Sequence, residues 1–419
     1  MKISRLLKVL VGASAAAVIL PPLASEPTTS PATAVTARTN AVDRATFESD
    51  LAAFFKEVDA TYPFFDLKGI REDWNRTKTR LSDKVKACES GTEFLGLVIE
   101  AMACLRDAHL NLRDAKAPLP EPPKLYYPGL AFLPAPEGRI IVLWAAEPYG
   151  DKLKPGTVVT QIDGQDARAF LEAKGKELWT RPDNPFSVSS PQRARMYAYR
   201  LPFAGPRGTT HTLRYRATGQ EQEWSVICEA EVRGWVHTYN LPAGLKRASG
   251  SVRHGRLPSG AGYLYLRKVG PETESGIRQA LEAHAEARGW VVDLRGNGGG
   301  GYDDKLIECL KDLPRPVAVL IDAGCISAGE TLARDLARHA GARLLGSPTA
   351  GSSSSKRTWT FPSGIASVTF STRSRWRTDG QPIEFNGIVP DVEIEAVPEE
   401  VARGLNSEIL RAEEHLAAQ

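Results

Sequence analysis

The chain has 419 residues, of which 42% are hydrophobic and 25% are charged, and its formal net charge is +3. This is the composition of a globular protein, and the length favours two or three compact units over a single one. Basic residues do not alternate with aromatic ones in any run, and there is no acidic tail, so nucleic acid is not an expected partner.

The N-terminus has the pattern of a secretory signal peptide. Three basic residues precede a short apolar run at 9–20, and prolines and small residues follow it. The run is too short for a comfortable membrane span, although an uncleaved anchor is the alternative. We therefore predict a signal peptide over 1–25, a flexible linker rich in Thr, Pro, Ala and Ser over 26–42, and a secreted or periplasmic protein without stable membrane insertion.

The stretch 43–117 has a helical pattern. Ser90 and Glu93 have the spacing of a capping box at a helix start, and a proline-rich connector at 118–128 ends the stretch. We therefore predict an N-terminal helical domain over 43–117. Apolar residues that recur at steps of three and four form the buried face of its first helix: Phe47, Leu51, Phe54, Phe55, Val58 and Tyr62.

A small unit rich in strands follows over 123–178. An apolar strand is expected at 140–144, and a turn, a strand and a second turn are expected between Leu153 and Gln165. The Lys-Pro-Gly turn and the Ile-Asp-Gly turn of that stretch resemble the closing half of a PDZ domain. We therefore predict a PDZ-like domain here.

From Gly262 onward, strands alternate with helices, which is typical of a layered α/β core. We predict this core over 179–400 and a C-terminal helix over 401–419. The strands expected in it are Tyr263–Arg267, Trp290–Leu294, Val317–Asp322 and Ala342–Leu345.

The five cysteines do not define a disulfide framework. Cys88 could pair with Cys104, and Cys309 with Cys325, and the odd count leaves at least one thiol over. No Cys-x-x-Cys motif or Cys/His spacing points to zinc, and we predict no metal and no other cofactor.

Ser327 stands between an expected strand and a helix expected over Ala328–Ala340. A serine at a helix start is often only an N-cap. A serine on a tight turn from strand to helix is also how a nucleophile elbow exposes its hydroxyl, although the Gly-x-Ser-x-Gly pattern of that elbow is absent. Both interpretations stay open on this residue alone.

Five glycines fall between Gly296 and Gly301, directly after the strand expected at Trp290–Leu294. Their spacing formally satisfies the Gly-x-Gly-x-x-Gly dinucleotide pattern, with Asp322 at the end of the next strand. Asp303 and Asp304 would then open the following helix where a pyrophosphate should bind, and their negative charge disfavours it. The other functional interpretation is an oxyanion hole built from glycine N–H groups.

Two further residues, His109 and Glu384, indicate a site only when they are considered together with the other motifs. His109 is one of seven histidines and lies in a short polar turn after an apolar helix. Glu384 lies in a turn-rich stretch between Asp379 and Asp391 and would be a solvated carboxylate by default. Neither residue identifies a site by itself.

Together these stretches resemble the family of C-terminal processing (tail-specific) proteases and the tricorn core peptidase. The resemblance runs in order through Leu105–Leu110, Trp290–Gly300, Val317–Gly351 and Gly380–Val392. It implies a serine peptidase with a crotonase/Clp-like βα superhelical core, polypeptide substrates and no cofactor.

The family uses two catalytic designs. In the tail-specific design, a lysine directly follows a Gly-x-x-Thr-x-Gly stretch, but here Ser352 follows Gly351, and the nearest lysine is Lys356. The tricorn-like design uses His and Glu, and its positions match His109 and Glu384. The serine that precedes the family's histidine is Ala108 here, so that polar helper is missing or supplied elsewhere.

The resemblance implies a Ser327–His109–Glu384 triad, in which His109 is the general base and Glu384 orients it. It also implies an oxyanion hole from the N–H groups of Gly298 or Gly299 with that of Ala328. The alternatives are a Ser–Lys dyad peptidase that uses Lys356, and a non-catalytic ligand- or peptide-binding protein on the same fold.

Overall fold

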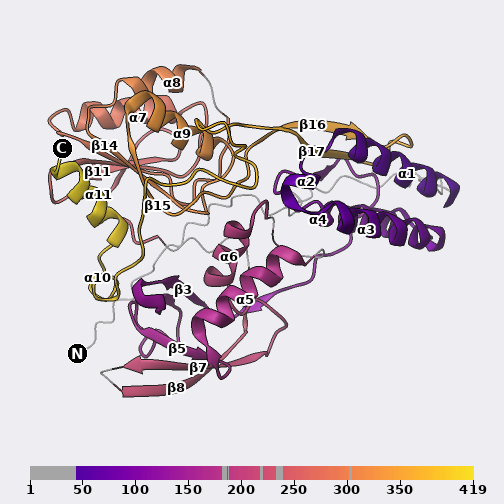
Figure 1. The fold of residues 1–419 in the computed structure, drawn as a ribbon, viewed down its shortest axis with the longest axis horizontal. Coiled ribbons are helices and arrows are strands. Elements are labelled where there is room, and N and C mark those ends of the chain that lie inside the picture. The colour runs from indigo at the N-terminus through magenta and orange to yellow at the C-terminus, as the bar shows by residue number, and fades with distance from the viewer. Residues whose placement is uncertain (1–43, 182–185, 187, 218–219, 233–238, 302–303) are drawn as a thin grey trace, which may run out of the picture.

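The computed structural model describes residues 44–181, 186, 188–217, 220–232, 239–301 and 304–419 (Figure 1). The predicted signal peptide and linker, and Asp303 of the glycine-rich stretch, lie outside these residues. In the described part, no helix is both long enough and apolar enough to cross a membrane.

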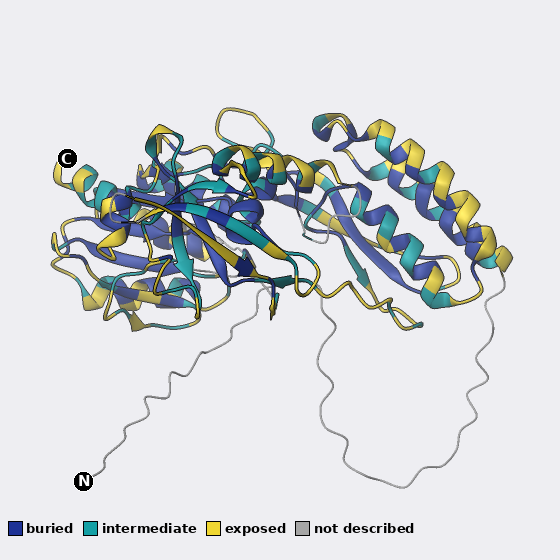
Figure 2. Ribbon diagram, turned by 90° about the horizontal axis from the view of Figure 1, so that it is seen from below, coloured by how far each residue is buried: buried dark blue, intermediate teal, exposed yellow. Residues whose placement is uncertain are grey.

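The N-terminal part is helical, as the apolar periodicity predicted. The Ser90 hydroxyl accepts the Glu93 N–H at 3.2 Å, which confirms the predicted start of its last long helix. The long helices expose one face and bury the other (Figure 2). The helices are α1 (Arg44–Thr61), α2 (Phe65–Lys68), α3 (Arg71–Lys84) and α4 (Gly91–Cys104).

These helices do not form their core alone. They pack on one face of a three-stranded antiparallel sheet of order β1–β17–β16, and Phe361 and Phe370 join the same buried cluster as Phe54 and Phe94. Figure 1 shows β16 and β17 running out from the C-terminal core to lie against α1 and α2. The strands are β1 (Asn111–Arg113), β16 (Ser354–Thr360) and β17 (Ser367–Ser374).

The middle of the chain forms a separate sheet whose main path is β3–β4–β5–β7–β8, covered by two helices. Its core includes Phe132, Val142, Leu171 and Tyr215, all buried. The strands are β3 (Leu130–Pro134), β4 (Ile140–Ala145), β5 (Val158–Ile162), β6 (Gln165–Asp166), β7 (Thr210–Ala217) and β8 (Gln220–Ile227), and the helices are α5 (Ala167–Thr180) and α6 (Pro191–Arg200).

The largest sheet has seven strands in the order β10–β11–β12–β13–β14–β15–β18, and it runs parallel from β12 to β18. The strands are β10 (Lys246–Arg247), β11 (Val252–Arg256), β12 (Gly262–Leu266), β13 (Trp290–Asp293), β14 (Val317–Ile321), β15 (Arg343–Gly346) and β18 (Val392–Glu393). The helices are α7 (Thr273–Ala283), α8 (Asp304–Lys311), α9 (Ala328–Ala340), α10 (Pro398–Ala402) and α11 (Ser407–Ala417).

This parallel order decides where the functional candidates meet. The glycine run follows β13 and Ser327 follows β14, and these strands are neighbours in the sheet. Since the carboxyl ends of neighbouring parallel strands lie at the same edge, the glycines and the serine come together there.

The five cysteines, all within the described residues, are buried and free. The two disulfide pairings considered from the sequence are therefore not present in this structure.

Candidate active site

Ser327 lies on a strained turn between β14 and α9. Its backbone has φ 55° and ψ −120°, a conformation that non-glycine residues seldom adopt. Its N–H donates to the Ser352 carbonyl at 2.9 Å, which fixes the turn against the following loop. This is the geometry of a nucleophile elbow, in which the turn holds the hydroxyl out from the chain.

The imidazole of His109 contacts this hydroxyl, although the two residues are far apart in the sequence. The Ser327 Oγ lies 3.1 Å from the His109 Nε2, a hydrogen-bond distance between residues 218 positions apart. The His109 backbone N–H donates to the Asp107 Oδ1 at 2.8 Å, which holds the histidine loop in place. The structure thus brings together two of the three residues that the sequence singled out.

The other ring nitrogen of His109 faces two oxygens. The Ser354 Oγ lies 3.4 Å from the Nδ1, and the Asp107 Oδ1 lies 4.0 Å from it. With the Ser327 hydroxyl donating to the Nε2, the Nδ1 carries the proton and donates toward these oxygens. Ser354 on β16 therefore places a hydroxyl beside the His109 Nδ1.

Glu384 is in the same region, but its partner is a lysine rather than the histidine. Its Oε1 lies 2.8 Å from the Lys68 Nζ, and both side chains are fully buried. The Glu384 Oε2 has no hydrogen-bond partner among the described residues. The structure thus shows no direct hydrogen bond from Glu384 to His109 within the described part of the chain.

Lys68 joins three segments at this point. Its ammonium also donates to the Arg106 carbonyl at 2.8 Å and to the Tyr62 hydroxyl at 3.0 Å, so all three of its protons are used. Lys68 ends α2, Arg106 precedes the histidine turn, and Glu384 belongs to the C-terminal core. One buried cation from the N-terminal helices therefore holds the His109 loop and the Glu384 loop together. The sequence does not mark this role, because a lysine at the end of a short helix gives no signal of burial.

Burial sets the charge of His109. It lowers the pKa of the imidazole to about 4, while the Asp107 carboxylate raises it and the cations Lys356 and Lys68 lower it further. The imidazole is therefore neutral at pH 7 and can accept a proton from Ser327. Burial also raises the pKa of the Glu384 carboxyl, and the Lys68 ammonium opposes that shift.

Glu330 supports the elbow from inside helix α9. Its fully buried carboxylate accepts the backbone N–H groups of Ser327, Gly351 and Ser352 at 3.0, 2.8 and 2.9 Å, and the Thr349 hydroxyl at 2.6 Å. Burial raises the pKa of this carboxyl, and the four donors lower it. The Ser-x-x-Glu spacing of Ser327 and Glu330 is a capping-box pattern, and it was the available signal for this role.

The glycine run lies directly against Ser327, but two of its N–H groups are already used. The Gly298 N–H donates to the Arg267 carbonyl at 3.0 Å, and the Gly299 N–H donates to the Asn297 Oδ1 at 2.9 Å. The expected oxyanion donors Gly298 and Gly299 are therefore not presented to Ser327 in this conformation, because the run needs them to hold its own turn. The N–H of Ala328 belongs to the first turn of α9, which has no acceptor within its own helix.

A side chain at Gly299 would not fit beside the elbow. A Cβ added there would lie 2.7 Å from the Ser327 Cβ, closer than such atoms approach in proteins. Gly299 has φ 74°, which also favours glycine. The glycine at this position is therefore required by close approach to the serine.

The structure explains the glycines and Asp322 of the dinucleotide pattern in another way. The Asp322 Oδ1 accepts the N–H groups of Gly296 and Gly324, both at 2.9 Å, so this oxygen holds the turn. Among the described residues, no group of three or more His, Cys, Asp or Glu side chains is arranged to hold a metal ion.

Lys356 lies on β16 and is exposed. It has no hydrogen bond to Ser327 among the described residues, so the structure does not form the Ser–Lys pair that was the alternative.

A cavity of about 780 Å³ lies between the middle sheet and the edge of the large sheet. Residues of β3 and α6 line one side, and Asp322 and Ser347, at the ends of β14 and β15, line the other. Ser327 and His109 are not among the described residues that line it.

Residues 302–394 match peptidase family S41. The match covers less than a quarter of the chain, and it includes Ser327, Glu330 and Glu384 but not His109. No curated protein sequence matches the chain.

Solved structures show the same fold over nearly the whole chain. The mature CPAF structure in complex with lactacystin aligns with a TM-score of 0.59 and 13% identity, covering 90% of this chain and 98% of the other. Mature CPAF aligns with a TM-score of 0.58 and 14% identity, covering 90% and 97%. At this identity the likeness shows the fold alone. The family match and the mixed α/β fold together support a peptidase of family S41.

The buried ion pair of Lys68 with Glu384 generates a stability prediction. Lys68→Met leaves the buried Glu384 carboxyl without its cation, and we expect the free energy of unfolding in urea to fall by about 3–5 kcal/mol. Lys68→Met/Glu384→Leu removes both charges and should recover most of that loss.

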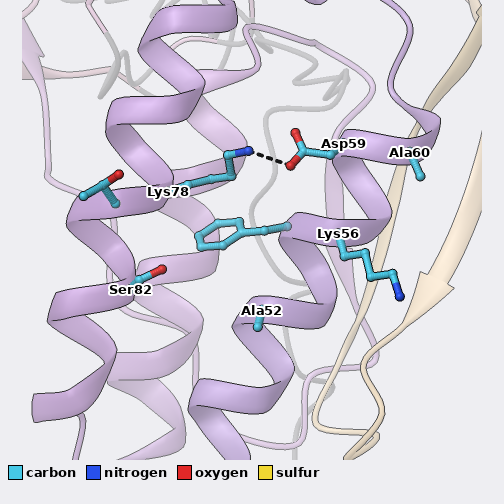
Figure 3. Close-up of a pocket in the computed structure, with 8 residues that line it drawn as sticks. Ala52, Lys56, Asp59, Ala60, Lys78 and Ser82 are labelled. Atoms are coloured by element: carbon cyan, nitrogen blue, oxygen red, sulfur yellow. Dashed lines mark hydrogen bonds and ion pairs between the residues drawn. The ribbon is translucent and has the colours of Figure 1, made fainter.

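The matched control is Lys78→Met, which breaks a more exposed pair with Asp59 in a shallow hollow between α1 and α3 (Figure 3). It should cost about 1 kcal/mol or less. Equal losses for Lys68→Met and Lys78→Met would contradict the account.

Glu330 generates a prediction for the reactivity of Ser327. Glu330→Gln replaces an acceptor of four hydrogen bonds by an amide whose N–H₂ faces donors, so the elbow should shift. We expect the rate at which a fluorophosphonate modifies Ser327 to fall by about tenfold to a hundredfold in protein that still unfolds cooperatively. The control is Glu274→Gln, which removes a carboxylate that pairs with Arg278 on the surface of α7. An unchanged rate in Glu330→Gln would show that the carboxylate does not position the serine.

Proposed function

We propose that this chain is an exported serine peptidase that hydrolyses peptide bonds of polypeptides, with Ser327 as nucleophile and His109 as general base. The observation that carries the proposal is the 3.1 Å distance from the Ser327 Oγ to the Nε2 of a histidine that burial keeps neutral. A protein that only binds a ligand has no need of a strained serine in contact with a neutral imidazole.

The proposed reaction is acyl transfer. His109 accepts the Ser327 proton as the hydroxyl attacks the carbonyl carbon, and it then protonates the departing amine. Water then attacks the acyl-enzyme with His109 again as the base, and the second product leaves. The Ala328 N–H is the first oxyanion donor in this scheme, and a donor from Gly298 or Gly299 requires the glycine run to release one of its present bonds.

Glu384 is the third residue of the proposed triad, although burial raises the pKa of its carboxyl to about 8 and the Lys68 ammonium opposes that shift. It is fully buried, and its Oε2 has no described partner. Ser354 and Asp107 make the nearest contacts of the His109 Nδ1, so Glu384 acts on the imidazolium by electrostatics and not by a hydrogen bond. This arrangement favours the tricorn-like design over a dyad with Lys356.

Several finer expectations belong to the same proposal. They are the crotonase/Clp-like description of the core, the PDZ-like nature of the middle sheet, and the domain limits given from the sequence. Export rests on the N-terminal pattern, and removal of residues 1–25 is its expected consequence.

Covalent labelling tests the nucleophile. A fluorophosphonate probe should modify the protein at Ser327, as mapped by mass spectrometry of the digested adduct. Labelling should be absent in Ser327→Ala, reduced by about a hundredfold or more in His109→Ala, and present in Lys356→Ala. Folded protein that stays unlabelled would contradict the proposal, and loss of labelling in Lys356→Ala would favour the dyad.

The pH dependence tests the base. Neutral His109 is the reactive form, so the labelling rate should rise with pH through about 4 and then stay level toward neutral pH. Lys356→Met removes a charge that lowers the pKa of His109, so this rise should move to higher pH, toward the ordinary histidine value. A rise centred near 6.5 in the unmodified protein would show that burial does not set the charge of His109.

A further inference from the structure

The two faces of the sheet β1–β17–β16 differ in character. The face toward the helices is apolar, since Trp359, Phe361, Val368 and Phe370 pack in the helical core. The opposite face, here called the polar face, carries only hydroxyl, amide and basic side chains, as the strand register shows. Its residues are Asn111 and Arg113 of β1, Ser354, Lys356, Thr358 and Thr360 of β16, and Ser367, Thr369 and Ser371 of β17.

Hydroxyl contacts confirm that these side chains share one face. The Thr358 and Thr369 hydroxyl oxygens lie 2.9 Å apart, and so do those of Thr360 and Ser367. Ser354 and Lys356 lie on the same side of β16 because side chains alternate along a strand, and the β-bulge opposite them adds Thr372 to β17.

The polar face begins at the catalytic pair. The Ser354 Oγ lies 2.5 Å from the Ser371 Oγ and 3.4 Å from the His109 Nδ1. Two residues before Ser354, the Ser352 carbonyl accepts the N–H of Ser327. β16 thus leads away from the nucleophile, and it is the edge strand of its sheet, so an extended chain can lie along it.

The cations on this face form no ion pair among the described residues, although the Asp107 carboxylate raises the pKa of the Lys356 ammonium. Lys356 and Arg113 are exposed, and neither forms an ion pair with a described residue. Arg357, the next residue along β16, points to the other face, where the Glu57 carboxylate pairs with it at 2.9 Å. The contrast shows that the chain neutralises a cation on the helical side and leaves those on the catalytic side available.

The Lys356 ammonium is influenced by charges of both signs. Burial lowers the pKa of the Lys356 ammonium, Asp107 raises it, and the positive charges of Arg375 and Arg113 lower it further. A carboxylate placed on the polar face would relieve this repulsion and gain a charge-assisted hydrogen bond.

We propose that the polar face is a substrate subsite, in which Lys356 and Arg113 select extended polypeptide segments that carry acidic side chains next to the scissile bond. This inference rests on the proposed peptidase function and names the class of substrate that the site prefers. In this subsite Lys356 and Arg113 act on binding, and the separate effect of Lys356 on the pKa of His109 is measured by the pH profile.

A library of peptides with blocked C-termini tests the proposal. The protein is incubated with the library at pH 7.5, where His109 is neutral, and the residues that flank the cleaved bonds are counted by mass spectrometry. We expect Asp and Glu to be enriched about two- to fivefold on one side of the cleaved bonds, the range for a solvent-accessible ion pair. Lys356→Glu/Arg113→Glu should abolish this enrichment and favour Lys and Arg instead, and on a cleaved acidic peptide it should raise KM with little change in kcat.

The matched control is Arg247→Glu/Arg253→Glu. These two exposed arginines pair across β10 and β11, at the far edge of the seven-stranded sheet, and the change in charge is the same. Control protein should keep the enrichment of the unmodified protein. Equal loss in both variants would overturn the subsite, because it would show an effect of net charge alone.

The outcomes separate the two proposals. Cleavage without acidic enrichment, or enrichment that survives Lys356→Glu/Arg113→Glu, overturns the subsite and leaves the peptidase. Enrichment that appears only when the library has free C-termini also overturns it, since the terminal carboxylate would then be the group recognised. If free protein cleaves no peptide of the library, although a separate sample of it reacts with the fluorophosphonate at Ser327, the peptidase is overturned and the subsite falls with it.

Discussion

The proposed chemistry depends on the contact between Ser327 and His109. It joins residues 218 positions apart, and each side is held by a separate set of bonds. The serine is fixed by its strained turn and by the carboxylate of Glu330, and the histidine loop is fixed by Asp107 and Lys68. Neither set of bonds alone would bring a hydroxyl to 3.1 Å from an imidazole nitrogen.

Burial gives this contact its chemistry. A histidine in water would be partly protonated near neutral pH, whereas the enclosed His109 is neutral there. The same burial raises the pKa of Glu384 and Glu330, and each carboxylate is supported by its own donors. Lys68 is the link between these effects, because it pairs with Glu384 and holds the chain just before Asp107. The N-terminal helices therefore belong to the proposed active site and do not merely flank it.

Much of the fold could be predicted because its elements have local signals. The apolar periodicity of α1, the capping box of α4 and the alternation of β13, β14 and α9 are each visible over a few residues. Ser327 and His109 could be named because a family pattern marks them. Lys68, Ser354 and Asp107 could not be placed, since their roles arise only when distant segments pack together. The prediction of Gly298 and Gly299 as oxyanion donors did not allow for the hydrogen bonds that their N–H groups make to Arg267 and Asn297.

Lys356 was the other candidate for the base, and the structure places it on an exposed strand.

Hydrolysis itself is the most direct test of the central claim. Purified protein is incubated with an unfolded polypeptide in water enriched in ¹⁸O, and the fragments are analysed by mass spectrometry beside a Ser327→Ala control. The account predicts fragments whose new C-termini carry ¹⁸O, and an intact polypeptide with the control. An intact polypeptide with the unmodified protein, or fragments that appear equally with Ser327→Ala, would contradict it.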